Sequence, residues 1–188
     1  GGHGPWLAWA IELAEALLGH FEDREAGGFY FTADDHEQLI LRPKTFGDDA
    51  TPSGNGVATR ALIRLGLLLG ETRYLDAAER TLRASWGVLE KFPHAHTSLL
   101  VALDELSDPP AIVVARGPRE DLDTWRTELD KYYDPRRFVA AIPDDATDLP
   151  AGLAAKRAQQ QTVAYLCRGM TCSAPLATLG ELVRALRS

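Results

Sequence analysis

The side chains best able to do chemistry are concentrated in one polar segment, residues 42–55, which lies just before an apolar stretch. The segment holds cations, carboxylates, hydroxyls and an amide at Arg42, Lys44, Asp48, Asp49, Thr51, Ser53 and Asn55. Such groups converging at the mouth of a cavity could hydrogen-bond a polyhydroxylated ligand. They could equally cap and order the start of the next helix, where hydroxyl side chains and carboxylates are favoured. The composition of the segment leaves both interpretations open.

A second acidic group, Asp34, Asp35 and Glu37, could supply a pair of carboxylates for general acid and base catalysis. These residues lie between two short β-like segments, where Asp is also an ordinary turn residue. The turn interpretation therefore stands beside the catalytic one.

His94 and His96 form a His-x-His pair at the start of a predicted helix. On a helix, residues two apart point about 200° away from each other, and no third ligand follows at a suitable spacing. We therefore expect no metal site, although one of the two imidazoles could line a cavity. The sequence contains no nucleophile elbow, phosphate-binding loop or dinucleotide fingerprint, and we expect no cofactor.

Cys167 and Cys172 are the two cysteines of the chain. Their Cys-x4-Cys spacing is not the redox-active Cys-x-x-Cys, and a tight turn is required to bring the thiols within disulfide distance. In a reducing compartment two thiols at the end of a strand are usually structural. Thiol chemistry remains the alternative.

The first half of the chain has the apolar periodicity of helices that position the polar segment. Apolar residues recur at steps of three and four over residues 5–21, 57–68, 72–89 and 93–106. Gly70 is placed to end the second helix, and Thr72 to cap the third. The intervening loop, residues 22–55, is long enough to suggest a function, and its segments 28–32 and 38–42 predict a small β-hairpin.

The second half has a different pattern. Residues 111–115 and 138–142 are continuous apolar runs typical of buried strands, and the segment between them has a helical apolar face. This arrangement predicts a right-handed β-α-β unit with parallel strands. Residues 162–167 predict a third strand, and Thr178 with Glu181 predicts a capping box that opens a last helix. The fold class is α+β, with a helical segment at residues 5–107 and a β-α-β-β-α domain at residues 111–188.

Composition excludes some functions. The chain has 188 residues, 20 Lys and Arg against 27 Asp and Glu, and a net charge of −7, which argues against binding nucleic acid. No apolar run approaches the roughly 20 residues that span a bilayer, and no signal segment opens the chain. We expect a cytoplasmic protein that does not contact a membrane.

Three segments together resemble a known family. They are GGFYFT at residues 27–32, RPK through DATPSGN at residues 42–55, and TVAYLCRGMTCSAP at residues 162–175. In this order they are similar to the C-terminal part of a thioredoxin-domain-containing family with spermatogenesis-associated members. Two positions depart from the family pattern: Gly56 stands where Ser is usual, and Gly169-Met170 where an Asn-aromatic pair is usual.

The resemblance implies a longer parent protein, in which a thioredoxin-like domain precedes an (α/α)6 toroid. Such toroids are similar to N-acylglucosamine 2-epimerase and the six-hairpin glycosidases, and their long loops line a sugar-binding cavity. On this basis Asp48 or Asp49 is the expected acid or base. The expected substrate-binding residues are Tyr30, Arg42, Lys44, Ser53 and Asn55.

The predicted function is accordingly that of a fragment of a carbohydrate-active toroid, inactive alone because four helices cannot close a twelve-helix cavity. The alternative is a non-catalytic scaffold or interaction module that partners the thioredoxin-like domain. Because a truncated toroid leaves apolar helix faces exposed, we also expect a homo-oligomer.

Overall fold

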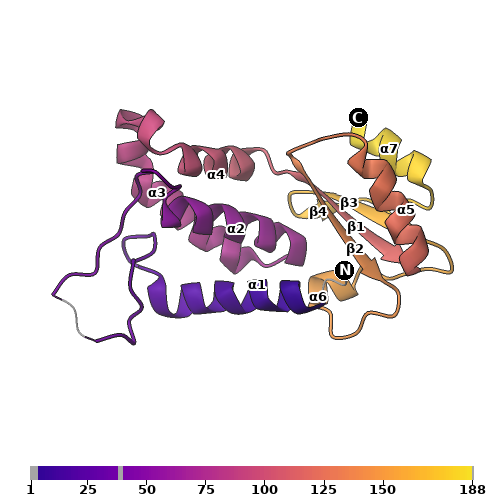
Figure 1. Cartoon of the computed structure of the whole chain (residues 1–188), viewed down its shortest axis with the longest axis horizontal. Coiled ribbons are helices and arrows are strands. Elements are labelled where there is room, and N and C mark those ends of the chain that lie inside the picture. The colour runs from indigo at the N-terminus through magenta and orange to yellow at the C-terminus, as the bar shows by residue number, and fades with distance from the viewer. Residues whose placement is uncertain (1–3, 38–39, 188) are drawn as a thin grey trace. The chain divides into compact units, whose positions relative to one another are not determined.

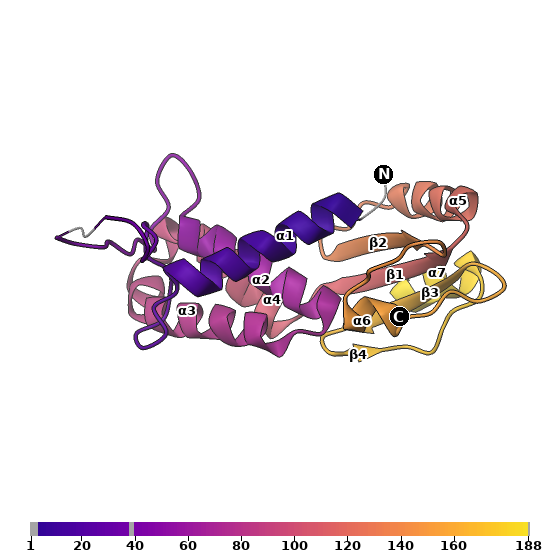
Figure 2. The ribbon, with the colours of Figure 1, turned by 90° about the horizontal axis from the view of Figure 1, so that it is seen from below.

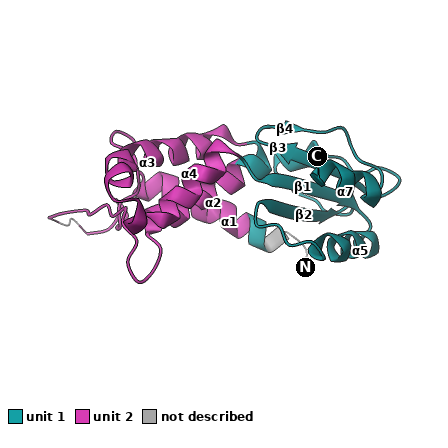
Figure 3. Cartoon of the chain, turned by 90° about the horizontal axis from the view of Figure 1, so that it is seen from above, with its two compact units in different colours: residues 1–7, 67–70, 109–188 teal, residues 8–66, 71–108 magenta. Residues whose placement is uncertain are grey.

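A computed structural model describes residues 4–37 and 40–187, and the chain divides into two compact units (Figure 3). Residues 8–66 and 71–108 form the helical unit, and residues 1–7, 67–70 and 109–188 form the sheet unit. Both helices and strands are present, so the α+β fold class is confirmed. The two units are described separately below.

Helices dominate the first half of the chain, at the four places where apolar periodicity predicts them (Figure 1). They are α1 (Gly4–Ala16) with a terminal π-turn η1 (Leu17–Phe21), α2 (Gly54–Leu69), α3 (Thr72–Lys91), and a short η2 (Pro93–Ala95) followed by α4 (Thr97–Ser107). The predicted fourth helix is therefore split in two, with His96 between its parts.

Local signals explain both ends of α2. Ser53 caps α2, because its Oγ accepts the N–H of Gly56 at 3.0 Å. Gly70 follows α2 with a φ of 75°, the left-handed conformation expected after a helix. The predicted cap by Thr72 is wrong, since Glu71 occupies the cap position of α3 and makes no side-chain capping bond.

Gly56, which departs from the family pattern, lies against α4. A Cβ at this position would lie 2.0 Å from Ser98 Oγ, far inside van der Waals contact. Because Ser98 fills this space, a side chain at residue 56 would require Ser98 to shift or the two helices to separate.

The apolar stripe of α1 is not buried as its periodicity predicts. Trp6, Trp9 and Leu13 are 72%, 54% and 51% exposed, whereas Ala14 is buried. Periodicity identifies the residues that share a face, but it carries no information on whether another element covers that face.

The predicted β-hairpin within residues 22–55 is wrong in the part of the loop that the structure describes. Its second strand includes residues 38 and 39, which lie outside the described residues. The two arms of the loop are joined by one backbone hydrogen bond, from Phe31 N–H to the Pro43 carbonyl at 2.9 Å. Other backbone hydrogen bonds of this loop are local or lead outside it, such as those from the Gly27 N–H to the Asp23 carbonyl and from the Asp48 N–H to the Ala95 carbonyl. Side chains hold further backbone groups, and a regular ladder does not form among the described residues of the loop.

The sheet unit follows the predicted β-α-β-β-α order with two additions (Figure 2). Its elements are β1 (Ala111–Gly117), α5 (Arg119–Asp130), β2 (Arg137–Pro143), α6 (Ala151–Ala154), β3 (Val163–Arg168), β4 (Thr171–Cys172) and α7 (Leu179–Arg187). The strand order is β2-β1-β3-β4. β1 and β2 are parallel, as predicted, and β3 is antiparallel to β1. The short α6 and β4 are not predicted.

The two faces of this sheet differ in character. Val113 and Ala115 of β1 pack with α5 and α7, through Leu122, Leu129 and Leu182, in a continuous apolar core. Alternate residues of β1, which include Ile112, Val114 and Arg116, point to the opposite face. The predicted capping box is confirmed: Thr178 Oγ1 accepts the Glu181 N–H at 3.2 Å, and the Glu181 carboxylate accepts the Thr178 N–H at 3.1 Å.

Candidate functional site

Asn55, at the start of α2, fastens both arms of the long loop. Its Oδ1 accepts the Phe29 N–H at 2.7 Å, and its Nδ2 donates to the carbonyls of Phe29 at 3.0 Å and Thr45 at 2.9 Å. The side chain is buried and its amide is almost fully used in these bonds. Asn55 therefore shapes the loop and has little capacity left for a ligand.

Asp48 joins the same loop to the start of α4. Its carboxylate accepts the N–H of Ser53 at 2.9 Å, the N–H of Ser98 at 2.8 Å, the hydroxyl of Thr97 at 2.8 Å, and the hydroxyl of Ser98. Burial raises the pKa of Asp48, but these hydrogen bonds outweigh burial and hold the pKa well below its usual range. A carboxylate so firmly ionised is a weak acid–base catalyst near neutral pH.

Lys44, Asp23 and Tyr30 form a compact polar cluster in the loop. Lys44 Nζ lies 2.7 Å from Asp23 Oδ2 and donates to the Gly27 carbonyl at 2.8 Å. The Tyr30 hydroxyl donates to the same carboxylate oxygen at 2.7 Å. The Lys44 ammonium, followed by the Ala26 N–H and the Tyr30 hydroxyl, holds the pKa of Asp23 far below its usual range.

Arg42 is also engaged within the loop. Its guanidinium lies over the Tyr30 ring, 4.3 Å from the ring centre, and donates to the Thr32 carbonyl at 2.7 Å and the His20 carbonyl at 3.1 Å. Arg42, Lys44, Asn55 and Asp48 thus stabilise the loop through their charged or polar ends. These hydrogen bonds agree with the interpretation in which the polar side chains of residues 42–55 order the loop and cap the next helix.

The ordered loop lines a cavity of about 850 Å³ on the helical unit. Its walls include the rings of Phe29, Tyr30 and Phe46, and its polar lining includes Asp49 and His96. The cavity therefore combines aromatic surface with a few polar groups, the usual composition of a small-molecule site.

Asp49 and His96 are the titratable lining residues whose reactive atoms remain available. Asp49 is exposed, and its carboxylate has no partner among the described residues. His96 Nδ1 lies 2.8 Å from the Phe92 carbonyl, which requires a proton on Nδ1 and leaves Nε2 as an acceptor in the neutral ring. His96 is 7% exposed and lines the cavity, and its Nε2 forms no hydrogen bond within the described part of the chain.

Glycine is required where the loop approaches its neighbours. Gly27 and Gly28 have φ values of 79° and 82°, which favour glycine. A Cβ on Gly27 would lie 2.5 Å from the Arg80 carbonyl oxygen, and one on Gly28 would lie 3.0 Å from the Phe46 ring. This pair of glycines lets the aromatic wall of the cavity close against Asn55.

The other predicted acidic group lies on the surface. Asp34, Asp35 and Glu37 are exposed, and Asp34 pairs with His20, whose Nδ1 lies 2.9 Å from Asp34 Oδ1. The hydrogen bond to Asp34 raises the pKa of His20, and the Asp35 charge adds to this effect. His20, Asp34 and Asp35 form the group with metal-ligand geometry in the described chain, but all three are exposed. His94 is exposed and is not part of this group.

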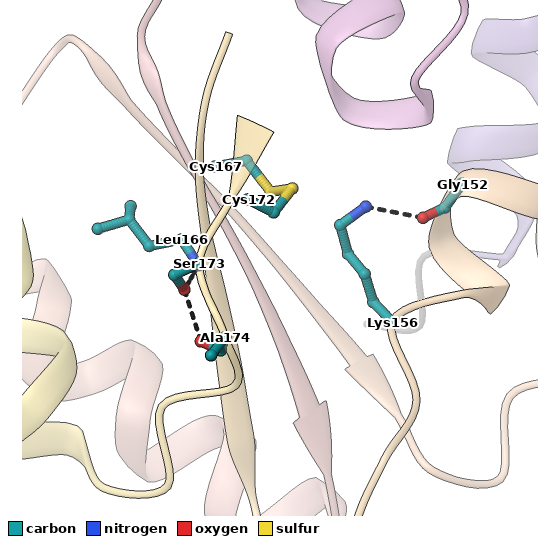
Figure 4. Close-up of a disulfide and its surroundings, with 7 residues drawn as sticks. All are labelled: Gly152, Lys156, Leu166, Cys167, Cys172, Ser173 and Ala174. Atoms are coloured by element: carbon teal, nitrogen blue, oxygen red, sulfur yellow. Dashed lines mark hydrogen bonds between the residues drawn. A yellow bond between two sulfur atoms is a disulfide. The ribbon is translucent and has the colours of Figure 1, made fainter. Parts of the chain in front are cut away.

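Cys167 and Cys172 form a disulfide between paired positions of β3 and β4 (Figure 4). The tight turn that the sequence requires for this pairing is supplied by residues 169 and 170, where Gly169 has a φ of 57°. Cys167 is buried and Cys172 is exposed. Because structural disulfides are rare in reducing compartments, the cytoplasmic location stays a prediction. None of the described helices is both long and apolar enough to cross a bilayer.

Local composition predicts Asp48, Arg42 and Lys44 as candidate site residues, but it does not show which polar groups bond to each other. The signal for His96 is tertiary. The spacing His-x-His suggests only that one ring could line a cavity, and the fold selects His96.

The fold and the site define an α+β protein with a loop-lined cavity on its helices, and comparison with known proteins adds relatives. No protein-family model matches the chain. The chain is similar to spermatogenesis-associated protein 20 of Homo sapiens, with 28% identity over 189 residues that cover 96% of this chain and 24% of that protein. It is also similar to uncharacterized protein B0495.5 of Caenorhabditis elegans, with 24% identity over 186 residues, 96% of this chain and 25% of the relative.

These similarities support the resemblance found in the sequence motifs. The chain spans about a quarter of the length of the curated relatives it matches. The names of these two relatives state neither a substrate nor a reaction, and the activity of this chain is therefore proposed from its own structure.

Proposed function

We propose that the chain forms part of a longer protein of the spermatogenesis-associated, thioredoxin-domain-containing family, and contributes a binding site for a polyhydroxylated, sugar-like ligand. The single observation that carries the proposal is the pair of available groups, Asp49 and His96, in a cavity of about 850 Å³ with aromatic walls. Ring faces pack against the apolar faces of a sugar, and acceptors bind its hydroxyls. We also propose that the chain forms part of a toroid similar to sugar epimerases or six-hairpin glycosidases.

In this site the residues fall into two groups: those whose polar atoms are available to a ligand, and those whose polar atoms are already used in hydrogen bonds. Asp49 and His96 Nε2 are the groups able to accept a proton from a bound hydroxyl or carbon acid. Asp48, Asn55, Lys44 and Arg42 act indirectly by holding the loop in place. Tyr30 supplies an aromatic surface, because its hydroxyl is committed to Asp23. Ser53 caps α2 and is likewise a positioning residue.

The direct test is titration of the purified chain with a panel of monosaccharides and linear polyols, monitored by backbone amide NMR shifts. We expect shifts confined to the residues around the cavity, and loss of binding in Asp49→Asn and His96→Gln. Asp76→Asn is the matched control, because Asp76 is exposed on α3 and lies outside the cavity. Shifts with no panel member, in the chain and in the full-length parent, contradict the proposal.

A specific observation favours a second function, that of an interaction module. Trp9 and Leu13 of α1 and Trp86 of α3 are each more than half exposed. Large apolar side chains on a surface are typical of association sites. The partner under this alternative is the thioredoxin-like domain of the parent or a second copy of the chain. Separate expression of the two pieces and co-purification tests the first, and light scattering tests the second.

A further inference from the structure

A buried arginine lies without an ion-pair partner among the described residues of the sheet unit, far in sequence from the loop-lined cavity. Arg116 is 5% exposed and occupies β1, one residue before the strand ends. No carboxylate among the described residues forms an ion pair with it, whereas the other buried charge of comparable exposure, Glu105, is paired with Arg60 and Arg64. A buried charge is normally paired, so the missing partner of Arg116 needs an explanation.

The hydrogen bonds of Arg116 are also incomplete. Its guanidinium donates from Nη1 to the Lys156 carbonyl at 3.1 Å and from Nη2 to the Pro143 carbonyl at 3.5 Å. Its Nε is buried and has no partner in the described part of the chain. A guanidinium has five N–H donors, so most of its capacity is unused. Both acceptors are neutral carbonyls, and the exposed Asp144 carboxylate acts on the guanidinium through its charge without forming an ion pair.

The position of Arg116 in the sheet is one where ligands commonly bind. β1 and β2 are parallel, and Arg116 pairs with Ile142 near the carboxyl end of both strands. The chain leaves β1 through α5 and leaves β2 through α6. In open sheets with parallel strands, the crevice beyond the carboxyl ends is the usual place for a ligand.

A cavity of about 490 Å³ opens at this end of the sheet, and Arg116 lines it. The other charged lining residues are Arg157, Asp144 and Asp148, all of them exposed. The formal charge of the lining is therefore balanced, with two guanidinium groups and two carboxylates. A phosphate dianion bound in this cavity would be repelled by the two carboxylates. A ligand that carries one negative and one positive charge can pair its negative group with the arginines and its positive group with the carboxylates.

We propose that this cavity binds a small amino carboxylate, such as a free α-amino acid. The ligand carboxylate supplies the hydrogen-bonded ion-pair partner that Arg116 lacks, because a guanidinium fork matches a carboxylate in two parallel hydrogen bonds. Arg157 adds a second positive charge at the rim. Asp144 and Asp148 receive the ligand ammonium. This site is separate from the loop-lined cavity and does not depend on the function proposed for it.

The test uses the whole chain and simple probes. L-Alanine, L-glutamate and L-arginine are titrated and followed by amide NMR shifts, with acetate, methylamine and inorganic phosphate as single-charge comparisons. We expect at least one amino acid to shift residues around Arg116 and to bind at least tenfold more tightly than acetate or methylamine. Tighter binding of phosphate than of every amino acid overturns the assignment, as does the absence of any shift.

Variants separate the proposed contacts from general stability. Arg157→Ala changes an exposed side chain and should weaken amino-acid binding severalfold. Asp144→Asn should weaken the amino acids while leaving acetate unchanged. Arg126→Ala is the control, because Arg126 is an exposed arginine of α5 outside this cavity. Equal loss of affinity in Arg126→Ala and Arg157→Ala contradicts the site.

Arg116→Met provides a readout that a purely structural arginine would not give. Because Met replaces a buried charge that has no ion-pair partner with an apolar side chain of similar length, the unliganded variant should unfold at the same or a higher urea concentration. It should nevertheless lose amino-acid binding by tenfold or more. A lower unfolding midpoint together with unchanged affinity overturns the proposal.

Discussion

The side-chain amide of Asn55 binds both backbone polar groups of Phe29. Asn55 Oδ1 accepts the Phe29 N–H at 2.7 Å, and Asn55 Nδ2 donates to the Phe29 carbonyl at 3.0 Å. A side-chain amide thus takes the place of a neighbouring strand, at the point where the sequence predicts a hairpin. The loop that lines the cavity is ordered by side chains from α2 and α4 in place of a β-ladder.

Replacement of Asn55 should therefore destabilise the protein strongly. Asn55→Ala leaves the buried polar atoms of Phe29 without partners, and we expect a loss of about 2–4 kcal/mol in the free energy of unfolding. Asn55→Asp keeps the acceptor for the Phe29 N–H but places a carboxylate against two carbonyls. Urea unfolding of both variants checks this prediction. A loss below about 0.5 kcal/mol for Asn55→Ala would show that the hydrogen bonds of the Asn55 side chain are not needed for stability.

A second prediction concerns the close approach of Gly56 and Ser98. Gly56→Ala places a Cβ at 2.0 Å from Ser98 Oγ, so α2 and α4 must separate locally. We expect a destabilisation of about 1–3 kcal/mol. In the background of Ser98→Gly, which removes the clashing atoms, the same change should cost much less. A double-mutant cycle by urea unfolding measures the coupling, and additive effects of the two substitutions would refute the steric explanation.

Glu105 links acid stability to the packing of α2 on α4. Burial raises the pKa of Glu105, but the hydrogen bonds from Arg64 and Arg60 outweigh burial, and the pKa lies below its ordinary value of 4.5. Since the folded-state pKa is lowered, the stabilisation is present above the unfolded-state pKa and is lost as the pH falls through the folded-state value. The affected range is acidic, below about pH 5.

The matched variant for this pH dependence is Glu105→Gln, which keeps the shape but removes the charge. At neutral pH we expect it to lose about 1–3 kcal/mol, because Arg64 and Arg60 donate to an ionised acceptor. Its stability should fall less steeply than that of the parent chain on acidification. Parallel curves of stability against pH for the two proteins would mean that Glu105 does not contribute.

Local sequence signals predict the regular elements of this chain well. The steps of three and four that define the helices, the apolar runs of β1 and β2, and the capping box of Thr178 and Glu181 depend on near neighbours. The short β4 and α6 have too few residues to leave such a signal. The exposed face of α1 shows the limit of periodicity, because burial depends on elements elsewhere in the fold.

The candidate site was harder to predict than the fold. Local composition marks the segment from Arg42 to Asn55 as rich in polar groups, but its charges are used in bonds that span up to fifty residues of sequence. Asp48 bonds to Thr97 and Ser98, and Lys44 bonds to Asp23. Which polar groups remain available is therefore a property of the tertiary structure. Arg116 gave no sequence signal, because it lies within an otherwise apolar strand.

The adjacent carboxylates of Asp48 and Asp49 differ in their hydrogen bonding and therefore in the roles we expect for them. Asp48 is saturated by hydrogen bonds and should be structural, whereas Asp49 has no partner among the described residues and should serve the ligand. Asp48→Asn should lower the free energy of unfolding by about 1–3 kcal/mol. Asp49→Asn should change stability by no more than about 0.5 kcal/mol.

The measurement that tests this difference in roles most directly is a sugar titration of the wild-type chain and of Asp49→Asn, followed through the His96 imidazole nitrogen signals. We predict that a bound polyol shifts Nε2 but not Nδ1, because Nδ1 is held by the Phe92 carbonyl, and that Asp49→Asn removes the shift while the unfolding midpoint stays unchanged. Unchanged Nε2 signals with every polyol tested, or an Asp49→Asn variant that binds as the wild type does, would contradict the account.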